Sequence, residues 1–263
     1  MKEIKPTLIG DIPNKLGNLE KNVIVYVDKY AINLNNYNHN DYDYKIYWQI
    51  EGQGVINGDG NNISFPIQHK NEFDLIIASD PTILNECENS VIFPFGDCWI
   101  PVEEQKVHDK NKLLSIIASE KNYLPGHTLR HLTIKNVGDK MDIYGKCCKF
   151  VENKSDALRD YMFTICTENL QIDNWFTEKL IDCLRTGTVP IYWGSSNIGN
   201  YFNVNGFIIV NSIEEIIDVV NNLSEEQYNS KLKFIEENFI TAAKYGNNLF
   251  ERVDNEIKKL INE

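Results

Sequence analysis

The residues best suited to chemistry in this chain stand at both ends of a loop between an apolar strand and a helix. The strand that begins at Phe163 ends on Thr167-Glu168-Asn169, and the next helix opens on Thr177-Glu178-Lys179. Free N–H groups of a first helical turn bind anions, and a lysine there adds a full positive charge. A carboxylate beside an anion site suits a nucleotide, because carboxylates accept hydrogen bonds from ribose hydroxyls. The pattern therefore predicts a nucleotide site.

Each of these residues also has a purely structural interpretation. The helix dipole alone favours Glu178 in a first turn, and Lys179 could be a solvated surface charge. Glu168 could be a loop carboxylate at a strand end, and Trp175, in the loop, an ordinary packing aromatic. Taken singly, Glu178 and Lys179 favour the structural interpretation, whereas Glu168 and Trp175 do not decide between the two.

Composition restricts the kind of ligand and the way it can be held. The 263 residues are 42% hydrophobic, which is enough for a sizeable core in one large or two small domains. Against 26 Lys and Arg stand 38 Asp and Glu, so the net charge is −12. This balance argues against a nucleic-acid partner, which needs a clustered basic face. An acidic protein must hold an anionic ligand with a few placed cations and backbone N–H groups.

Other features point to a cytoplasmic protein with reduced thiols. No apolar run approaches the length of a membrane span, and the N-terminal MKEIKPTLIG lacks the apolar core of a signal peptide. The six cysteines include no C-x-x-C pair, which favours structural thiols. We expect no transmembrane segment, and the sequence does not set the oligomeric state.

The elements around these residues predict an α/β fold in two domains. Short apolar runs at residues 22–26, 44–50, 73–78 and 90–95 indicate strands of one sheet. From residue 112, strands alternate with helices, which is typical of right-handed βαβ units and a parallel sheet. The polar stretch near residues 105–112 is the expected linker, so the predicted domains are residues 1–108 and 109–263.

The C-terminal region carries the clearest helical signals. Ser212 with Glu215, and Ser224 with Gln227, each form a capping-box pattern before an apolar-periodic run. A last helix is expected from Thr241 to the end. We expect the final helices to pack back on the N-terminal domain.

The central part of the chain resembles the glycosyltransferase family 10 α-1,3-fucosyltransferases. Their signature runs F-E-N, then Y-[IV]-T-E-K, then G-T-V-P-I-Y-W-G, and this chain has Glu168-Asn169, Thr177-Glu178-Lys179 and an unbroken GTVPIYWG at residues 187–194. Upstream, SIIASEKNYLPGHTLRHL is similar to the family's strand with a Ser and helix with an Arg, and DIYGK to its V-D-x-Y-G segment. Thr167 replaces the usual Phe and Trp175 the usual Tyr. The resemblance covers roughly residues 113–210.

The resemblance implies a GT-B fold, with two Rossmann-like domains facing a cleft. The N-terminal domain would hold the acceptor and the C-terminal domain the nucleotide sugar. The implied reaction is the inverting transfer of L-fucose from GDP-fucose to a hydroxyl of a glycan acceptor. Two alternatives stay open, namely the same fold with another GDP- or UDP-sugar, and a non-catalytic glycan-binding domain.

The resemblance also assigns residues to the donor site. Arg130 and Lys179 would neutralise the diphosphate, Glu178 would hold the ribose, and Glu168 and Asn169 would line the pocket. The remaining donor-site candidates are Ser119, Tyr144, Gly145, Trp175 and Thr177.

The catalytic base is expected in the N-terminal domain, because the acceptor hydroxyl must approach the anomeric carbon from the face opposite the diphosphate. The strand IYWQIE ends on Glu51 before a Gly-rich turn, and the family places its base in a similar strand-end segment. Glu51 is therefore the candidate base, with a solvated strand-end charge as the structural alternative. Asp74 and Asp80 are the reserve candidates.

No cofactor or bound metal is expected. His127 and His131 share a helix face at i, i+4 but lack a third ligand nearby. Asp41 and Asp43 form an Asp-x-Asp pair in a polar loop, with no apolar strand leading into it.

Overall fold

The protein divides into two compact units that do not follow the expected boundary. The computed structural model describes residues 3–52 and 61–262. The first unit contains Met1–Phe95, Ile172–Trp175 and Asn248–Glu263, and the second contains Gly96–Gln171 and Phe176–Asn247. The first boundary thus follows Phe95 and not residue 108, and the chain returns to the first unit twice.

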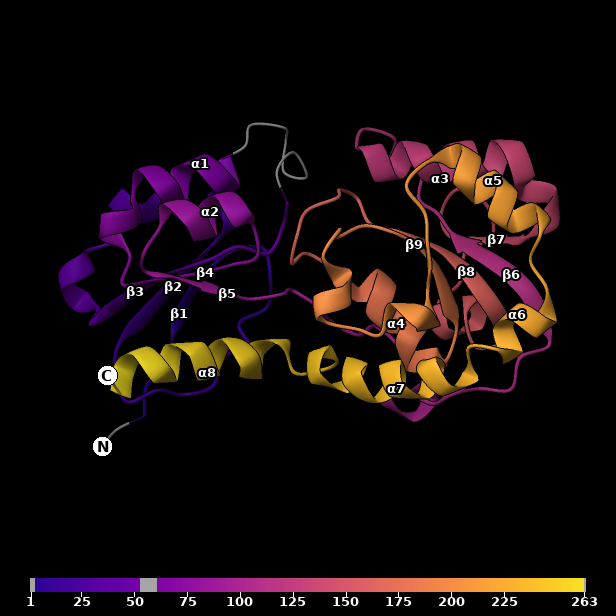
Figure 1. Ribbon diagram of the computed structural model, residues 1–263. Helices are drawn as coiled ribbons and strands as arrows, with labels where there is room; N and C mark the ends of the chain where they lie inside the picture. Colours follow the sequence, from indigo (N-terminus) through magenta and orange to yellow (C-terminus); the bar gives the residue numbers. More distant parts are fainter. Residues whose placement is uncertain (1–2, 53–60, 263) are drawn as a thin grey trace. The chain divides into compact units, whose positions relative to one another are not determined.

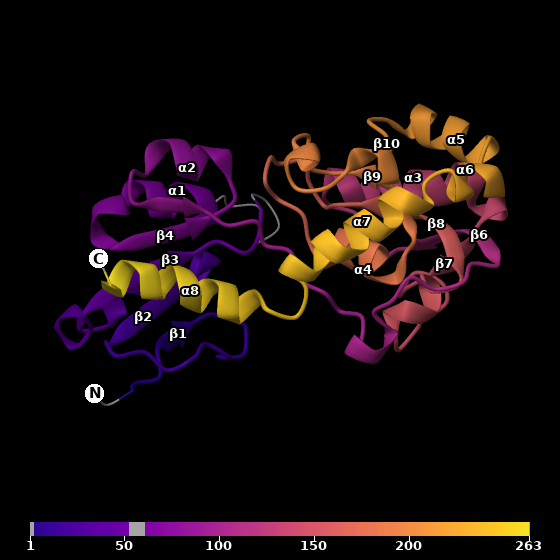
Figure 2. The same cartoon turned by 60° about the horizontal axis from the view of Figure 1, so that its bottom comes forward.

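The first unit is a parallel sheet with helices on both faces. Its strands lie in the order β1-β2-β3-β4-β5. Their bounds are β1 Thr7–Ile9, β2 Val23–Val27, β3 Tyr44–Trp48, β4 Leu75–Ala78 and β5 Ser90–Ile92. Helices α1 (Asn61–Gln68) and α2 (Pro81–Glu86) cover one face, and α8 (Leu249–Asn262) covers the other (Figures 1 and 2). Because both faces are covered, β2 and β4 are buried along their whole length.

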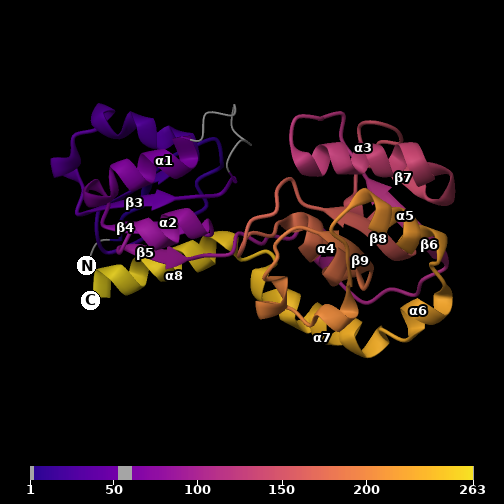
Figure 3. The same ribbon diagram turned by 45° about the horizontal axis from the view of Figure 1, so that its top comes forward.

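The second unit is a parallel sheet with strands in the order β10-β9-β8-β6-β7. Its strands are β6 Lys112–Ile117, β7 Asp142–Tyr144, β8 Tyr161–Thr167, β9 Val189–Trp193 and β10 Ile208–Ile209. Its helices are α3 Pro125–Val137, α4 Glu178–Thr186, α5 Ile213–Asn221, α6 Glu225–Asn229 and α7 Leu232–Ala242. Helices α3 and α5 lie on one face of the sheet, and α4 and α7 on the other (Figures 1 and 3). The predicted βαβ alternation and parallel sheet are confirmed.

The strand order of the second unit reverses between β6 and β8. The chain leaves β6 through α3 to reach β7 on one side, and leaves β8 through α4 to reach β9 on the other. Ile116 on β6 pairs with Ile165 on β8, so the carboxyl ends of these strands lie side by side. Open α/β sheets bind ligands at such a switch point, beyond the carboxyl ends of the strands.

The expected linker is part of the second unit. The ammonium of Lys110 donates to the carbonyls of Arg159 and Thr186 at 3.0 and 2.8 Å and to the hydroxyl of Thr188 at 2.9 Å. Burial lowers the pKa of Lys110 to about 7. These bonds fix the polar stretch at residues 105–112 to the second unit. The composition of the stretch does not predict this attachment.

The C-terminal helices differ in part from the prediction. Ser224 and Gln227 form the complete capping box of α6, whereas the Glu215 carboxylate bonds the N–H of Asn211. The last helix begins at Leu249 and not at Thr241, because Asn247 adopts a left-handed backbone conformation with φ 60° that interrupts the helix. Of the final helices only α8 belongs to the first unit.

Two further observations concern the cysteines and the helix lengths. All six cysteines are free, four of them buried. Among the residues that the structure covers, no helix combines the length and apolar character needed to cross a bilayer.

Candidate functional site

The first turn of α4 binds a carboxylate of the protein itself. Glu168, fully buried just past the end of β8, accepts hydrogen bonds from the N–H and the hydroxyl of Thr177, both at 2.8 Å. Thr177 caps α4, and its hydroxyl accepts from the backbone N–H of Lys179 at 3.3 Å. Two of the backbone donors at this turn, the N–H groups of Thr177 and Lys179, are thus already bonded within the protein.

Glu168 is the first member of a series of ion pairs in which acidic and basic side chains alternate beside α4. The Lys179 ammonium lies 3.7 Å from Glu168 and 3.2 Å from Glu178. The Lys154 ammonium lies 3.6 Å from Glu178 and 3.2 Å from Asp182. We call these five residues the ion-pair chain. Lys179 is its most exposed member, with 27% of its side chain open to solvent.

Burial and the ion pairs shift the pKa values of the carboxylates in the ion-pair chain in different directions. Burial alone would raise the pKa of Glu178, but Lys179 and Lys154 outweigh it and lower the pKa to about 2. Burial raises the pKa of Glu168, although Lys179 opposes the shift. Burial also raises the pKa of Asp182 to about 6. Glu178 is thus an anion that can accept hydrogen bonds from hydroxyls at any ordinary pH.

Lys154 is a site residue that the sequence analysis missed. It lies in a short 3-10 helix, Lys154–Ala157, with its ammonium 4.1 Å from the centre of the Trp99 ring. No periodic pattern marks it. The only local signal is Asn153, whose side chain caps that turn by accepting from Ser155 N–H at 3.0 Å.

Arg130 is buried on α3 and holds the end of β8. Its Nε donates to the Thr167 hydroxyl at 2.7 Å, and its Nη2 donates to the Thr167 carbonyl at 3.0 Å and the Asn169 side-chain oxygen at 2.8 Å. Its Nη1 makes no hydrogen bond within residues 3–52 and 61–262, and is the part of the guanidinium available to a ligand. Thr167, where the family signature has Phe, is a hydrogen-bond partner of the predicted cation.

The N-terminus of α3 lies directly against Glu168 and Asn169. The N–H of Gly126 donates to the Asn169 carbonyl at 3.0 Å. A Cβ at Gly126 would overlap the Glu168 carbonyl oxygen, so only glycine permits this approach. The structure thus brings Arg130, Glu168, Asn169, Thr177, Glu178 and Lys179 together at the switch point.

The remaining donor-site candidates of the second unit have different environments. Ser119 is half-buried two residues beyond the end of β6. Tyr144 is buried, and its hydroxyl bonds that of Tyr161 at 2.6 Å, so it is a packing residue. Gly145 has φ 104°, and a Cβ there would overlap the Ala118 carbonyl oxygen. Gly145 therefore lets β7 end close against β6.

Trp175 belongs to the first unit, whereas the other donor-site candidates belong to the second. It is 1% exposed, and its indole N–H donates to the Ile50 carbonyl at 3.2 Å. Buried and bonded in this way, Trp175 anchors the segment Ile172–Trp175 in the first unit. The sequence motif gives its position in the loop but not the unit into which it packs.

Glu51 stands three residues after β3, beside a buried aspartate that the sequence analysis did not select. Asp28, directly after β2, accepts from the N–H groups of Ile50 and Glu51 at 2.9 and 3.2 Å. Asp28 has a strained backbone with φ 48°, and burial raises its pKa to about 8. The signal that could have found it is the apolar strand VIVYV ending on a carboxylate.

The reserve candidates for the base differ in position. Asp80 lies at the carboxyl end of β4 and caps α2 by accepting from Thr82 N–H at 2.8 Å. Asp74 precedes β4 and accepts from Lys45 N–H at 2.7 Å. Asp74 is thus at the amino end of its strand, opposite the edge where ligands bind in such sheets.

Within the described residues, no group of three or more His, Cys, Asp or Glu side chains could hold a metal ion. The His131 ring bonds the Lys121 carbonyl at 3.0 Å, while His127 is buried. Asp43 accepts from Asn22 N–H at 2.9 Å, and Asp41 from the Asn38 side chain at 3.2 Å.

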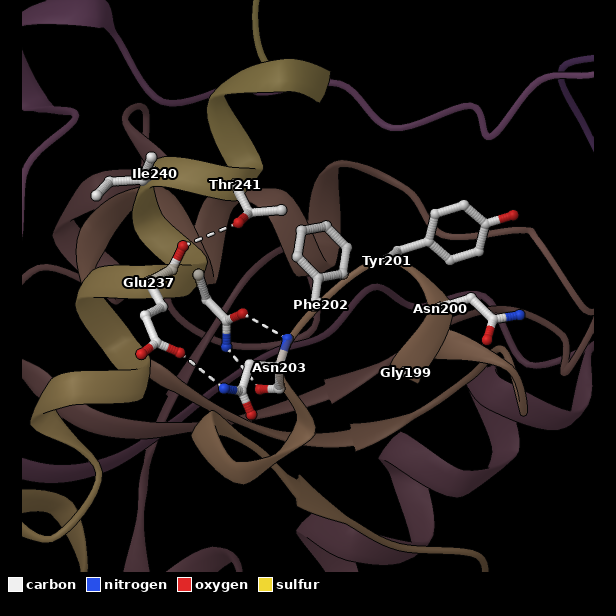
Figure 4. Close-up of a pocket in the computed structure, with 9 residues that line it drawn as sticks. Gly199, Asn200, Tyr201, Phe202, Asn203, Glu237, Ile240 and Thr241 are labelled. Atoms are coloured by element: carbon white, nitrogen blue, oxygen red, sulfur yellow. Dashed lines mark hydrogen bonds between the residues drawn. The ribbon is translucent and has the colours of Figure 1, made fainter.

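A separate pocket of about 570 Å³ lies in the second unit between the loop after β9 and α7 (Figure 4). Its polar groups bond one another, since the Asn203 side chain donates to Glu237 at 2.7 Å and Asn238 bonds the Asn203 backbone at 2.9 Å. None of the candidate residues lines it. The pocket is lined by Gly199, Asn200, Tyr201, Phe202, Asn203, Glu237, Asn238, Ile240 and Thr241.

Comparison with known proteins identifies the family. The family model for the C-terminal part of glycosyltransferase family 10 (fucosyltransferase) matches residues 107–244, which are 138 of the 263 residues. This chain belongs to glycosyltransferase family 10. The match contains every residue that the structure gathers at the switch point.

Curated relatives of this family 10 chain share shorter segments. The α-(1,3)-fucosyltransferase FucT of Helicobacter pylori is 37% identical over 91 residues, which are 34% of this chain and 19% of that protein. An α-(1,4)-fucosyltransferase of Arabidopsis thaliana is 31% identical over 78 residues, 26% of this chain and 20% of that protein. The alignments thus span about a fifth of these relatives.

Solved structures share the fold with this family 10 chain. A crystal structure of an α1,3-fucosyltransferase with GDP-fucose has a TM-score of 0.53 and 19% identity, covering 80% of this chain and 68% of that one. Anabaena HepE in complex with UDP has a TM-score of 0.64 and 12% identity, covering 91% and 78%. The chain has the GT-B type of fold, with two Rossmann-like units.

Proposed function

We propose that this protein transfers L-fucose from GDP-fucose to a hydroxyl of a glycan acceptor, with inversion at the anomeric carbon. The proposal rests on one observation. Two cations, Arg130 and Lys179, and the ionised Glu178 lie together at the switch point of the second unit. A nucleoside diphosphate sugar needs both kinds of group, cations for its diphosphate and a carboxylate for its ribose. Membership of family 10 supports fucose as the sugar.

The proposed roles follow from the bonds that each group already makes. Arg130 has Nη1 left for a phosphate oxygen, since Nε and Nη2 bind Thr167 and Asn169. Lys179 is held by Thr177 at 3.0 Å and exposes part of its side chain. Both cations stabilise the leaving diphosphate as negative charge develops on it. Glu168 orients Thr177 and Lys179, and both of its carboxylate oxygens already accept hydrogen bonds from Thr177.

We propose Glu51 as the general base that takes the proton of the acceptor hydroxyl. Its backbone is fixed from several sides, because Asp28 binds its N–H and the Asn62 side chain donates to its carbonyl. A base on a fixed backbone can meet the hydrogen-bond geometry that proton transfer requires. Single displacement then needs no covalent intermediate.

We also propose that the reaction needs no resident metal ion, because two protein cations are present to neutralise the diphosphate. Activity should survive excess EDTA, assayed as GDP release from GDP-fucose with acceptor. Complete loss that Mg²⁺ or Mn²⁺ restores would contradict this and direct attention to Asp41 and Asp43.

A UDP-sugar is the alternative donor. The structures of Anabaena HepE with UDP and with UDP-glucose align with TM-scores of 0.64 and 0.62, above the 0.53 of the fucosyltransferase with GDP-fucose. This likeness concerns the fold alone, whereas the signature at residues 187–194 and the family match favour GDP-fucose.

A donor panel in a thermal-shift assay separates the possibilities. We expect GDP-fucose to raise the Tm more than GDP-mannose, UDP-glucose or UDP-N-acetylglucosamine. A larger increase in Tm with a UDP-sugar would show that the donor is that sugar nucleotide and not GDP-fucose. Binding of oligosaccharides without any donor shift would favour a non-catalytic glycan-binding domain.

A further inference from the structure

Two helix N-termini meet at the switch point, and they differ in what they bind. The first turn of α4 is capped by Thr177 and bonded to Glu168. The 13-residue helix α3 has no side-chain cap, since its N-cap residue is Leu124. Gly126 N–H bonds the Asn169 carbonyl, but the N–H of His127 makes no hydrogen bond to any residue that the structure covers. The N-terminus of α3 therefore keeps a backbone donor for an anion.

The side chain of His127 points to the same ligand. Its exposed fraction is only 3%, yet neither ring nitrogen bonds a residue within 3–52 or 61–262, and Nδ1 is fully buried without a partner. The ring packs against Tyr123, with centroids 4.8 Å apart at 69°. Buried polar atoms are nearly always paired, so an unpaired imidazole in this position calls for a missing partner.

The groups around His127 define the charge of that partner. The ring interacts electrostatically with Arg130 and His131 on α3, with Lys121 before α3, and with Lys179 on α4. The groups that act electrostatically on the imidazole thus come from three segments, and they are Arg, Lys and His side chains that disfavour a positive charge on the ring. These groups favour an anion as the missing partner.

We propose that His127 binds the diphosphate of the nucleotide sugar, together with the free N–H at the start of α3. This inference rests on the proposed function and adds a third side chain to Arg130 and Lys179. The imidazole donates one N–H to a phosphate oxygen, while the backbone N–H of His127 donates a second hydrogen bond.

The proposal has a consequence for pH. Without ligand, burial and then the neighbouring cations lower the pKa of His127 to about 4, so the imidazole is neutral near pH 7. A bound diphosphate opposes both effects, because its negative charge favours the imidazolium, and so the pKa rises in the complex. A group that binds its proton more tightly in the complex makes affinity increase as the pH falls.

The test is calorimetry of GDP-fucose binding at pH 7.5 and 5.5, for the wild type, His127→Gln and His131→Gln. GDP-fucose is the probe because its diphosphate is a diester that does not titrate between these pH values. We expect His127→Gln to bind about tenfold more weakly at pH 7.5, the size of one hydrogen bond to a charged group. His131→Gln is the matched control, one helical turn further on, and should bind as the wild type does.

The wild type provides a second measurement that needs no variant. Its dissociation constant should fall about three- to tenfold from pH 7.5 to 5.5, and proton uptake should appear as a buffer-dependent binding enthalpy near pH 6. His131→Gln should keep both effects. Unchanged affinity in folded His127→Gln, or no proton uptake by the wild type, would overturn the role of His127 while leaving the proposed function intact. A wild type that does not bind GDP-fucose would overturn both.

Discussion

Lys179 neutralises charge within the protein before any ligand arrives. It pairs with Glu168 and Glu178, and these pairs raise its pKa in spite of the burial that opposes them. It is therefore a permanent cation with a quarter of its side chain open to solvent. A group so fixed can stabilise the diphosphate without reorganising during the reaction.

Removing that cation should slow transfer much more than it weakens the fold. Lys179→Ala is expected to lower kcat/KM for GDP-fucose. The expected loss of transition-state stabilisation is about 2–4 kcal/mol. Glu168 and Glu178 keep Thr177 and Lys154 as partners, so the variant should still fold. Steady-state kinetics check this, with Lys135→Ala, an exposed lysine near the end of α3, as control. Equal kcat/KM in the two variants would remove Lys179 from the site.

The raised pKa of Asp28 predicts that the stability of the protein depends on pH. Burial raises its pKa from 3.8 to about 8, so between these values the folded state holds a proton that the unfolded state has lost. The free energy of unfolding should then decrease as the pH rises from about 4 to 8. In Asp28→Asn this decrease should be smaller, as measured by urea unfolding at pH 5 and 8.5. The exposed Asp139→Asn is the control, and a wild-type pH dependence in Asp28→Asn would contradict the shift.

The residues that sequence alone identified are those inside a contiguous motif. Glu168, Thr177, Glu178 and Lys179 lie within a stretch of twelve residues, and helix and strand periodicity is enough to place them at one sheet edge. Lys154 and Asp28 were missed, because their partners come from distant segments. The environment of Trp175 was not predictable for the same reason, since its hydrogen-bond partner Ile50 lies 125 residues away.

At the scale of elements, the site depends on two helices that start at the end of β8 from opposite faces of the sheet. Helix α3 reaches Glu168 and Asn169 through Gly126, while α4 reaches Glu168 through Thr177. The order of these elements followed from the sequence, because apolar runs and capping residues are local signals. The close approach of α3 did not, since it depends on the absence of a Cβ at one position.

Gly126→Ala tests that approach. The added methyl group would overlap the Glu168 carbonyl, so the start of α3 must shift away from β8. We expect a loss of stability of about 3 kcal/mol or more, at the upper end of overpacking effects, together with weaker donor binding. Thermal unfolding measures the first effect, and Gly138→Ala at the other end of α3, where a Cβ meets side-chain atoms at 3.3 Å, is the control. Equal Tm values for the two variants would show that α3 does not require the glycine.

At the scale of the whole molecule, the sequence predicted two domains but misplaced their boundary. The composition of the polar stretch near residues 105–112 predicts a linker, whereas the half-buried Lys110 fixes this stretch to the second unit. The segment Ile172–Trp175 and helix α8 return to the first unit. Composition cannot show such returns, because each depends on contacts between segments far apart in the chain.

The division into two units predicts that donor binding and acceptor activation can be separated by mutation. Glu51→Gln in the first unit should leave the affinity for GDP-fucose nearly unchanged and lower kcat by about 10²–10⁴-fold, the contribution of a general base. Calorimetry and a transfer assay measure the two quantities, and Asp74→Asn is the matched control. A wild-type transfer rate in Glu51→Gln would assign the base to another residue.

The central claim is tested most directly by following sugar transfer itself. The protein is incubated with GDP-fucose and a mixture of oligosaccharides, and products are analysed by mass spectrometry while GDP release is quantified. The account predicts an oligosaccharide heavier by one deoxyhexose, formed in equal amount to the GDP, and a strongly reduced yield with Lys179→Ala. It would be contradicted if no deoxyhexose were transferred from GDP-fucose while a UDP-sugar gave a glycosylated product.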